Sequence, residues 1–176
     1  MPDVPVLTTP RLQLRGFRED DFPAYAAMMA DPEVTRHLAD GRPLERTDAW
    51  RQLAMFAGHW VLRGFGVWAV EERASGRFVG RIGCFEPEGW PAFEIAYTLS
   101  PTVWGQGYAS EGARAALTYA HTVLGRRGVT SVIRPGNAPS IRVAEGLGAV
   151  RGREVSFYGA PALLYMYPDP VPEPAP

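Results

Sequence analysis

The stretch Trp104-Gly105-Gln106-Gly107-Tyr108-Ala109-Ser110-Glu111 decides the fold, because it joins a strand-like apolar run at residues 93–100 to an alanine-rich helical pattern that continues to about Leu124. A strand, a glycine-bearing turn and a helix start, in that order, make a site for phosphate. Gly105 and Gly107 permit backbone conformations that a side chain would block, and the first N–H groups of the helix carry partial positive charge. Glycine before a helix is also ordinary turn chemistry, so the stretch alone does not establish such a site.

Two familiar phosphate sites do not fit the residues. A dinucleotide fingerprint needs a third glycine, where this chain has Ser110, and a carboxylate about 20 residues further on, where residues 126–128 offer none. The phosphate loop of nucleotide hydrolases needs a lysine after its last glycine. This chain contains no lysine, which also excludes Schiff-base chemistry on a lysine.

Length, charge and cysteine content limit the class of protein. The chain of 176 residues has the length of one domain, and its 18 basic and 19 acidic residues give a net charge of −1. Such a balance favours neither nucleic acid nor an anionic membrane as a partner, and no apolar run is long enough to span a bilayer. The single cysteine, Cys84, excludes an internal disulfide. The single cysteine and the lack of a membrane-spanning run predict a cytoplasmic protein. His37, His59 and His121 lack metal-ligand spacing, so we expect no bound metal.

Hydrophobic periodicity predicts alternating strands and helices. Short turns make the strands at 66–72, 78–85 and 93–100 antiparallel neighbours, and a helical crossover makes the strand at 129–134 parallel to the strand at 93–100. Asp20 or Asp21 is predicted to cap a helix that follows it. The remaining predicted strands are at 11–17, 150–158 and 162–167. Helices are predicted from about Phe22 to Met29, from Asp31 through Leu38, from Thr47 to Gly64, from Ala109 to Leu124 and from Pro139 to Leu147. The apolar face of the helix at 47–64 is predicted to contain Trp50, Leu53, Ala54, Ala57, Trp60 and Val61, and that of the helix at 109–124 to contain Val123.

Three motifs in this order resemble the GNAT family of N-acetyltransferases, and most closely its RimJ/RimL-like branch of ribosomal-protein N-terminal acetyltransferases. They are the strand Glu94 to Pro101, the loop Trp104 to Glu111, and the segment from Asn137 to Gly148. The resemblance runs from Thr9 to about Tyr167. It implies an α/β GNAT fold, a mixed and splayed β-sheet flanked by helices, in a single domain at residues 1–167. The proline-rich tail at 168–176 is expected to be extended and mobile.

The resemblance implies acetyl-CoA as co-substrate and assigns residues to it. The pyrophosphate would bind the glycine turn and helix start, and the pantetheine arm would pair with the open edge of the preceding strand, as a peptide pairs with a sheet edge. The asparagine and serine of the third motif would contact the arm and the region of the sulfur. The cofactor-binding residues are therefore Tyr97, Thr98, Leu99, Trp104, Gly105, Gln106, Gly107, Tyr108, Ala109, Ser110, Asn137 and Ser140.

Glu94 and Ser140 are the candidate catalytic residues. Glu94 projects from the less apolar face of its strand, where the family often places a carboxylate that takes a proton from the amine; the alternative is a carboxylate paired with an arginine. Many relatives carry a tyrosine that protonates the leaving thiolate four residues after the Ser140 position. This chain has Ala144 there, so Ser140 becomes the candidate for a hydrogen bond to the thiolate. Asn137 and Ser140 are also ordinary helix-capping residues.

The predicted function is direct transfer of acetyl from acetyl-CoA to a primary amine, such as a protein N-terminal α-amine. Two alternatives stay open: acetylation of a small amine (an antibiotic, a polyamine or an amino acid), and an acyl-CoA-binding module without transfer activity. Cys84 shows no sign of activation, which favours a direct reaction over an acyl-enzyme. The family resemblance also allows a homodimer, although the sequence identifies no interface.

Overall fold

A computed structural model of the protein describes residues 4–170. The predicted mobile tail at 168–176 lies mostly outside the described residues. Its first part lies within them: the Asp169 carboxylate accepts a hydrogen bond from the Gly128 N–H at 2.9 Å, and the Pro170 carbonyl accepts one from Arg127 at 2.7 Å. These contacts tie the start of the tail to the connection that follows the long alanine-rich helix.

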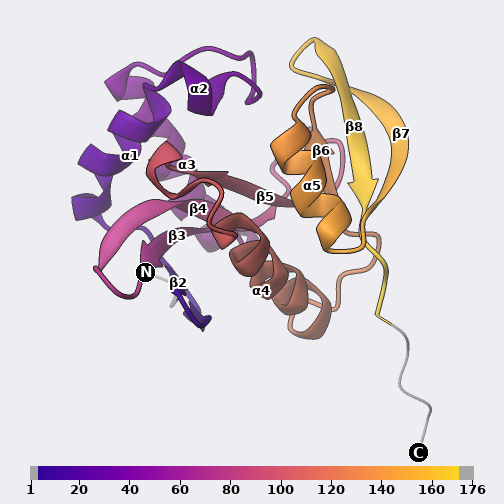
Figure 1. The fold of residues 1–176 in the computed structure, drawn as a ribbon, viewed down its shortest axis with the longest axis horizontal. Helices are drawn as coiled ribbons and strands as arrows, with labels where there is room; N and C mark the ends of the chain where they lie inside the picture. Colours follow the sequence, from indigo (N-terminus) through magenta and orange to yellow (C-terminus); the bar gives the residue numbers. More distant parts are fainter. Residues whose placement is uncertain (1–3, 171–176) are drawn as a thin grey trace, which may run out of the picture.

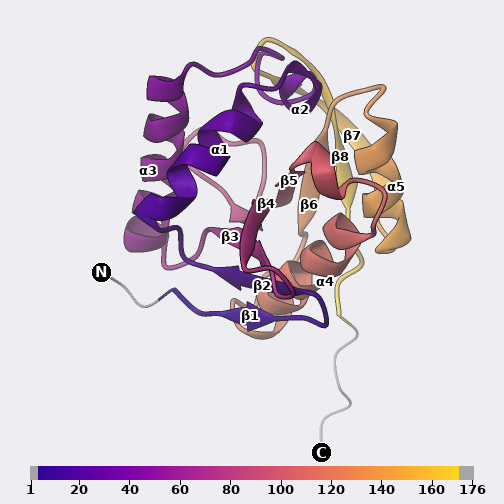
Figure 2. The same cartoon turned by 60° about the vertical axis from the view of Figure 1, so that its left-hand side comes forward.

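The fold is built on one mixed sheet with the strand order β1-β2-β3-β4-β5-β6-β8-β7 (Figures 1 and 2). All neighbouring strands are antiparallel except β5 and β6, which are parallel, as predicted. The final hairpin places β8 between β6 and β7. The strands are β1 (Leu7–Thr8), β2 (Leu12–Arg15), β3 (Val67–Glu72), β4 (Arg77–Phe85), β5 (Glu94–Leu99), β6 (Thr130–Ile133), β7 (Val150–Phe157) and β8 (Ala160–Met166).

Helices cover both faces of the sheet (Figures 1 and 2). The first three lie over one face, α4 packs on β2, β4 and β5 from the other, and α5 lies beside β6 and β8. They are α1 (Phe22–Met29), α2 (Pro32–Thr35), α3 (Arg46–Arg63), α4 (Tyr108–Thr122) and α5 (Ala138–Gly146), with short 3-10 turns at Glu19–Asp21 and Pro101–Val103. Within residues 4–170, no helix combines the length and the apolar character needed to cross a bilayer. The predicted α/β architecture, a mixed sheet flanked by helices, is confirmed.

The two parallel strands diverge after one residue pair. Glu94 lies opposite Thr130, and no further pair continues the register, although β5 has six residues and β6 has four. Side chains replace the missing ladder: the Ser131 hydroxyl donates to the Ile95 carbonyl at 2.6 Å, and the Glu94 carboxylate accepts from the Val132 N–H at 2.9 Å. The edge of β5 beyond Ile95 is therefore without a neighbouring strand on the β6 side.

Three sequence predictions about helices were wrong in detail. Asp21 makes no capping bond to α1, because its carboxylate binds the Arg15 guanidinium through two hydrogen bonds of 2.7 and 2.8 Å. On α3, Trp50 is 56% exposed and Val61 is exposed as well, because the buried face consists of Ala49, Phe56, His59 and the predicted Trp60. Val123, at the end of α4, is also exposed. Helical spacing alone does not choose between two adjacent apolar stripes.

Helix α4 lies very close to the sheet, as its alanine content predicted. Ala113, Ala116 and Ala120 are fully buried, and a Cβ added to Gly112 would lie 2.4 Å from the terminal methyl of Ile82 on β4. This close approach fixes the height of α4 above β4 and β5. It also fixes the position of the helix N-terminus relative to the end of β5.

We predict that Gly112→Val destabilises the protein by about 1–3 kcal/mol, because the added methyl groups overpack the layer between α4 and β4. The matched control is Gly58→Val on α3, where an added Cβ meets nothing within 4 Å. That change should alter the free energy of unfolding by less than about 0.5 kcal/mol, since valine and glycine differ little in helix propensity. Urea unfolding of both variants measures the difference, and equal effects would contradict the close packing.

Candidate active site

The glycine turn presents the start of α4 without a side-chain cap. Gly105 and Gly107 have φ values of 74° and 79°, in the left-handed region that favours glycine. Gly107 is the N-cap residue, so it has no side chain to accept the first N–H groups of α4, and no capping hydrogen bond is present. Tyr108, Ala109 and Ser110 supply these first groups, as predicted from the sequence. An uncapped start of a 15-residue helix is suited to binding an anion.

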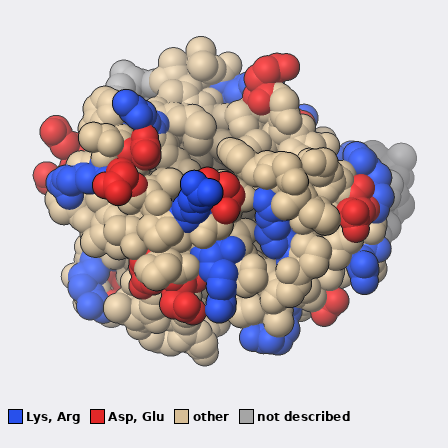
Figure 3. Space-filling view, turned by 90° about the horizontal axis from the view of Figure 1, so that it is seen from above, with Lys and Arg blue, Asp and Glu red and all other residues tan. Residues whose placement is uncertain are grey.

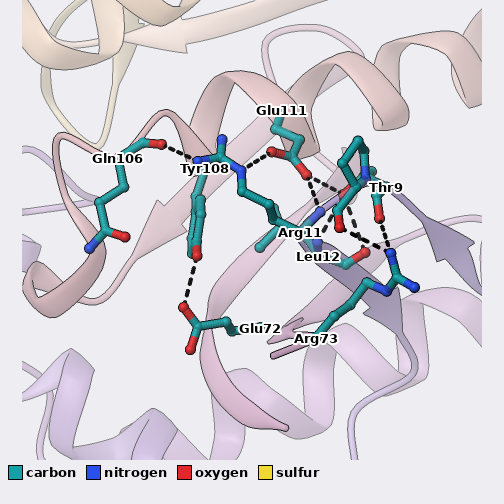
Figure 4. A network of polar contacts seen from close by, with 9 residues as sticks. Thr9, Arg11, Leu12, Glu72, Arg73, Gln106, Tyr108 and Glu111 are labelled. Atoms are coloured by element: carbon teal, nitrogen blue, oxygen red, sulfur yellow. Dashed lines mark hydrogen bonds and ion pairs between the residues drawn. The ribbon is translucent and has the colours of Figure 1, made fainter. Parts of the chain in front are cut away.

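A network of polar contacts supports this turn (Figure 4). Arg11, between β1 and β2, donates to the Gln106 carbonyl at 2.7 Å and to the Glu111 carboxylate at 2.6 Å, and its guanidinium lies over the Tyr108 ring. Burial alone would raise the pKa of Glu111, but the hydrogen bonds from Thr9 and Arg11 outweigh it and the pKa is lowered. The carboxylate therefore stays ionised and keeps Arg11 in place.

Other side chains of the turn also point back to the protein. The Gln106 amide donates to the Thr102 carbonyl at 3.2 Å, and the Tyr108 hydroxyl donates to Glu72 at 2.8 Å. The Trp104 indole donates to the Leu99 carbonyl at 2.8 Å, so this carbonyl at the end of β5 is already bonded. What the turn offers to a ligand is thus its backbone.

A cavity of about 320 Å³ lies where β5 and β6 separate, on the side of α2 and α3. Its volume is at the lower end of those of small-molecule sites. Four of its lining residues form a chain of edge-to-face aromatic contacts, in the order Phe85, Trp90, Phe157 and Tyr158. The predicted site residues that line it are Glu94, Tyr97, Thr98, Asn137 and Ser140, and they are joined by His37, Gln52, Phe56, Arg81 and Ser131, among others.

Glu94 lies buried at this cavity with both oxygens engaged. One oxygen accepts from the Trp90 indole and the other from the Val132 N–H, each at 2.9 Å. Burial raises the pKa of Glu94 to about 7, although these two hydrogen bonds and the charge of Arg81 oppose the rise. Among residues 4–170, no arginine lies within ion-pair distance of Glu94, so the alternative of a simple salt bridge is wrong.

Helix α5 begins at the other side of the cavity. Asn137 is its N-cap and accepts a hydrogen bond from the Ser140 N–H at 3.3 Å, so the capping role weighed from the sequence is real. Both residues nevertheless line the cavity. The Tyr97 hydroxyl crosses from β5 to the Ser140 carbonyl at 2.8 Å and links the two diverging parts. Ala144 is fully buried and offers no acid at the position where relatives carry tyrosine.

Sequence reasoning missed Arg81 and Trp90. Arg81 follows no motif, but its position was readable once β4 and β5 were paired, because Arg81 lies opposite Thr98. Trp90 belongs to the turn before β5, and only the fold shows that its indole reaches Glu94. Cys84 is fully buried, and burial raises the pKa of its thiol, which agrees with the prediction of an unreactive cysteine. His59 is packed, with Nδ1 at 2.7 Å from the Phe65 carbonyl.

Charged side chains of both signs are interspersed on the face that Figure 3 shows, without a continuous patch of one sign. This distribution agrees with the net charge of −1. Electrostatic attraction of a ligand must therefore come from local groups at the cavity and the glycine turn.

Comparison with known proteins places this geometry in a family. A family model described as an acetyltransferase (GNAT) domain matches residues 11–150. The chain belongs to the GNAT acetyltransferase family. It is 30% identical over 167 residues to the uncharacterized protein YkkB of Bacillus subtilis, covering 90% of this chain and 93% of YkkB. It also matches the crystal structure of an acetyltransferase from Agrobacterium tumefaciens with 30% identity and a TM-score of 0.85, covering 95% and 96% of the two chains. The GNAT enzyme described here is an acetyl-CoA-dependent acetyltransferase.

Two more distant structures share the fold alone, each at 17% identity. One is RimL, a ribosomal L7/L12 α-N-protein acetyltransferase in complex with CoA, with a TM-score of 0.77 over 94% of this chain and 98% of RimL. The other is spermidine N-acetyltransferase of Vibrio cholerae with CoA and spermine, with a TM-score of 0.72 over 90% and 95%. Proteins of this fold thus include enzymes named for protein and for small amine substrates. Membership of the RimJ/RimL-like branch stays a prediction.

We predict that Arg11→Lys weakens CoA binding about fivefold. Lysine keeps the charge but cannot hold the Gln106 carbonyl and the Glu111 carboxylate together, so the glycine turn loses its support; a half-exposed contact of this kind stabilises by about 1 kcal/mol. Calorimetric titration with CoA measures the dissociation constant. The control is Arg51→Lys in the exposed pair with Asp48, which should leave the constant unchanged. An unchanged constant in Arg11→Lys would show that the network does not position the turn.

The raised pKa of Glu94 predicts a pH-dependent stability. Its pKa is about 7 in the folded protein against an ordinary 4.5, so the wild type should lose stability relative to Glu94→Gln as the pH rises from 4.5 to 7. The full loss should approach ~3 kcal/mol and level off above the folded pKa. Urea unfolding of both proteins between pH 4 and pH 9 measures this difference, in which shared groups cancel. A difference independent of pH would mean that Glu94 titrates normally.

Proposed function

We propose that this enzyme transfers the acetyl group of acetyl-CoA directly to a primary amine held in the 320 Å³ cavity, with Glu94 as the general base. The observation that carries the proposal is the position of Glu94. Its buried carboxylate lies beside the gap between β5 and β6, and its pKa of about 7 matches proton abstraction near neutral pH. Amine and thioester would meet in this gap, one from each face of the sheet.

Different segments of the chain would bind different parts of acetyl-CoA. The uncapped backbone from Gly105 to Ser110 would bind the pyrophosphate, with Trp104 closing the end of β5. The free edge of β5 at Tyr97, Thr98 and Leu99 would pair with the amides of the pantetheine arm, because no strand occupies it. Asn137 would hold the arm from the start of α5. Acetyl-CoA supplies the activated acetyl group and needs no metal for this transfer.

In the reaction, Glu94 accepts a proton from the ammonium form of the acceptor. The amine nitrogen then bonds to the acetyl carbon, the carbon–sulfur bond breaks, and the thiolate leaves with the bonding electron pair. The second proton lost by the nitrogen passes to the thiolate, which gives the CoA thiol. The Ser140 hydroxyl would donate a hydrogen bond to that thiolate, since Ala144 cannot. Backbone N–H groups near Tyr97 would stabilise the oxyanion. Most of the acceleration comes from the orientation of amine and thioester.

The cavity favours a small amine over a protein N-terminus. Six of its lining residues are aromatic, and its lining carboxylates are Glu94 and the exposed Glu88. Arg134, directly after β6, donates to the carbonyl of Ala39, a lining residue in the loop after α2. A site for protein N-termini would be expected to be acidic and open along one direction, to let the polypeptide leave. The protein N-terminal α-amine therefore becomes the second candidate acceptor.

We predict that Glu94→Gln lowers kcat by about 10²–10⁴-fold, the usual contribution of a general base. In the wild type, kcat/KM should rise with pH through an apparent pKa near 7, because the free enzyme needs ionised Glu94. The measurement is release of the CoA thiol with a panel of primary amines and N-terminal peptides.

The Glu94→Gln variant should still bind acetyl-CoA in a calorimetric titration, and ATP should not compete. Binding without turnover of any acceptor by the wild type would instead identify an acyl-CoA-binding module. A full loss of binding to CoA and acetyl-CoA would contradict the role of the glycine turn.

A further inference from the structure

Arg81 is a buried cation without a partner anion. Arg81 is 8% exposed and lies on β4, where it lines the cavity. Its guanidinium carbon lies 4.9 Å from the centroid of the Phe56 ring. Within the described part of the chain, residues 4–170, no carboxylate lies within ion-pair distance of Arg81, and its Nε makes no hydrogen bond. A buried charge left in this state is costly, so such groups are normally paired.

Arg15 shows how the same fold treats a buried arginine that serves the structure. It is 5% exposed, as deeply buried as Arg81, but it binds Asp21 through two hydrogen bonds and Glu71 through a third at 2.8 Å. These carboxylates raise the pKa of Arg15. Among residues 4–170, no carboxylate contacts Arg81 directly, and the charge of Glu94 acts on it only from beyond ion-pair distance, which separates it from a structural arginine.

A second unpartnered donor lies beside Arg81. Thr98 on β5 is its cross-strand neighbour, so both side chains project from the same face of the sheet. Thr98 is 8% exposed, lines the same cavity, and its buried Oγ1 makes no hydrogen bond. Two adjacent buried donors, a guanidinium and a hydroxyl, are thus turned toward one cavity.

The other polar groups nearby are already committed. Glu94 accepts from Trp90 and Val132. The Tyr25 hydroxyl donates to Gln52 and is close enough to Arg81 to accept a hydrogen bond from it. Burial raises the pKa of Tyr25 to about 12 although the charge of Arg81 and this hydrogen bond oppose the rise, so Tyr25 stays neutral and supplies no anion. What Arg81 lacks is an anion in direct contact, and a bound ligand would supply it. A carboxylate matches the donors, because its two oxygens fit the planar guanidinium and its single charge balances the single cation.

We infer that the acceptor is an amino acid, whose carboxylate binds Arg81 and Thr98 while its amine lies toward Glu94. The inference deepens the acetyl transfer proposed above and rests on it. Glu94 and Thr98 are four residues apart on β5, a span of about 13 Å between Cα atoms that the two side chains and an amino acid bridge. The side chain of the amino acid lies against the aromatic walls of the cavity.

The test compares glycine and each L-amino acid that has a primary α-amine with its own carboxamide as acceptor. The members of a pair share a side chain and differ in the carboxylate charge and in the basicity of the α-amine, so the ratio of the two kcat/KM values is compared between the wild type and Arg81→Met, in which the amine difference cancels. We expect the acid of the best pair to be preferred at least about 30-fold. If no acid is preferred over its own carboxamide, the inference is overturned, while acetyl transfer to amines stays intact.

Variants assign the preference to the two donors. Arg81→Met should abolish the preference for the acid, and Arg81→Lys should restore part of it. The exposed control Arg51→Met should keep the wild-type ratio. Thr98→Val should lower the ratio several-fold without lowering stability, because it replaces an unpartnered buried hydroxyl by an isosteric methyl group. A loss of stability with an unchanged ratio would assign Thr98 to structure and contradict its role.

A binding measurement keeps the inference testable without turnover. Thermal unfolding of the CoA-loaded protein is followed with N-acetyl amino acids and with their carboxamides. Stabilisation by the acids alone, lost in Arg81→Met, would support the carboxylate site even if the transfer itself failed. No difference between the acids and the carboxamides would overturn it.

Discussion

The separation of β5 from β6 is the constraint on which the rest of the structure depends. Two parallel strands that share a single residue pair leave backbone groups without partners, and buried backbone groups must be satisfied. This protein satisfies them with side chains near the point of separation: Ser131 bonds the Ile95 carbonyl, and Glu94 accepts the Val132 N–H. Further along, the edge of β5 stays open. Part of the gap is the 320 Å³ cavity, which is lined by residues of both strands.

The same interaction gives Glu94 its chemistry. Because its carboxylate takes the place of a backbone carbonyl in the broken ladder, it is buried at the junction of the strands instead of at the surface. Burial raises its pKa to about 7, and the two N–H donors keep the ionised form accessible. The group that completes the sheet is therefore also suited to exchange a proton. In the proposed mechanism the same side chain also acts in catalysis, so the stability and the activity of any Glu94 variant must be measured together.

Local patterns in the sequence predicted most of the fold. Alternating apolar residues placed the strands, and the glycines of Trp104 to Ser110 placed the start of α4. Local patterns do not predict contacts between distant elements, which explains the errors. The Asp21 carboxylate binds Arg15 of β2 instead of capping α1, and the way α3 packs leaves Trp50 exposed. Glu94 could be proposed from its strand face and the family motif. Arg81 and Trp90 could not, because their role arises from neighbours on other elements.

Charge in the cavity follows from these neighbours. When Glu94 is protonated, Arg81 is the only charge buried there, and the local field favours an anion; when Glu94 ionises, the two charges balance across the cavity. A zwitterion places its carboxylate on the first group and its ammonium near the second, so each charge of the ligand meets its opposite. Proton transfer to Glu94 then removes the ammonium charge just as the amine becomes nucleophilic. The buried cation and the acid with the raised pKa are thus two halves of one electrostatic arrangement, in which binding of the carboxylate positions the amine for attack.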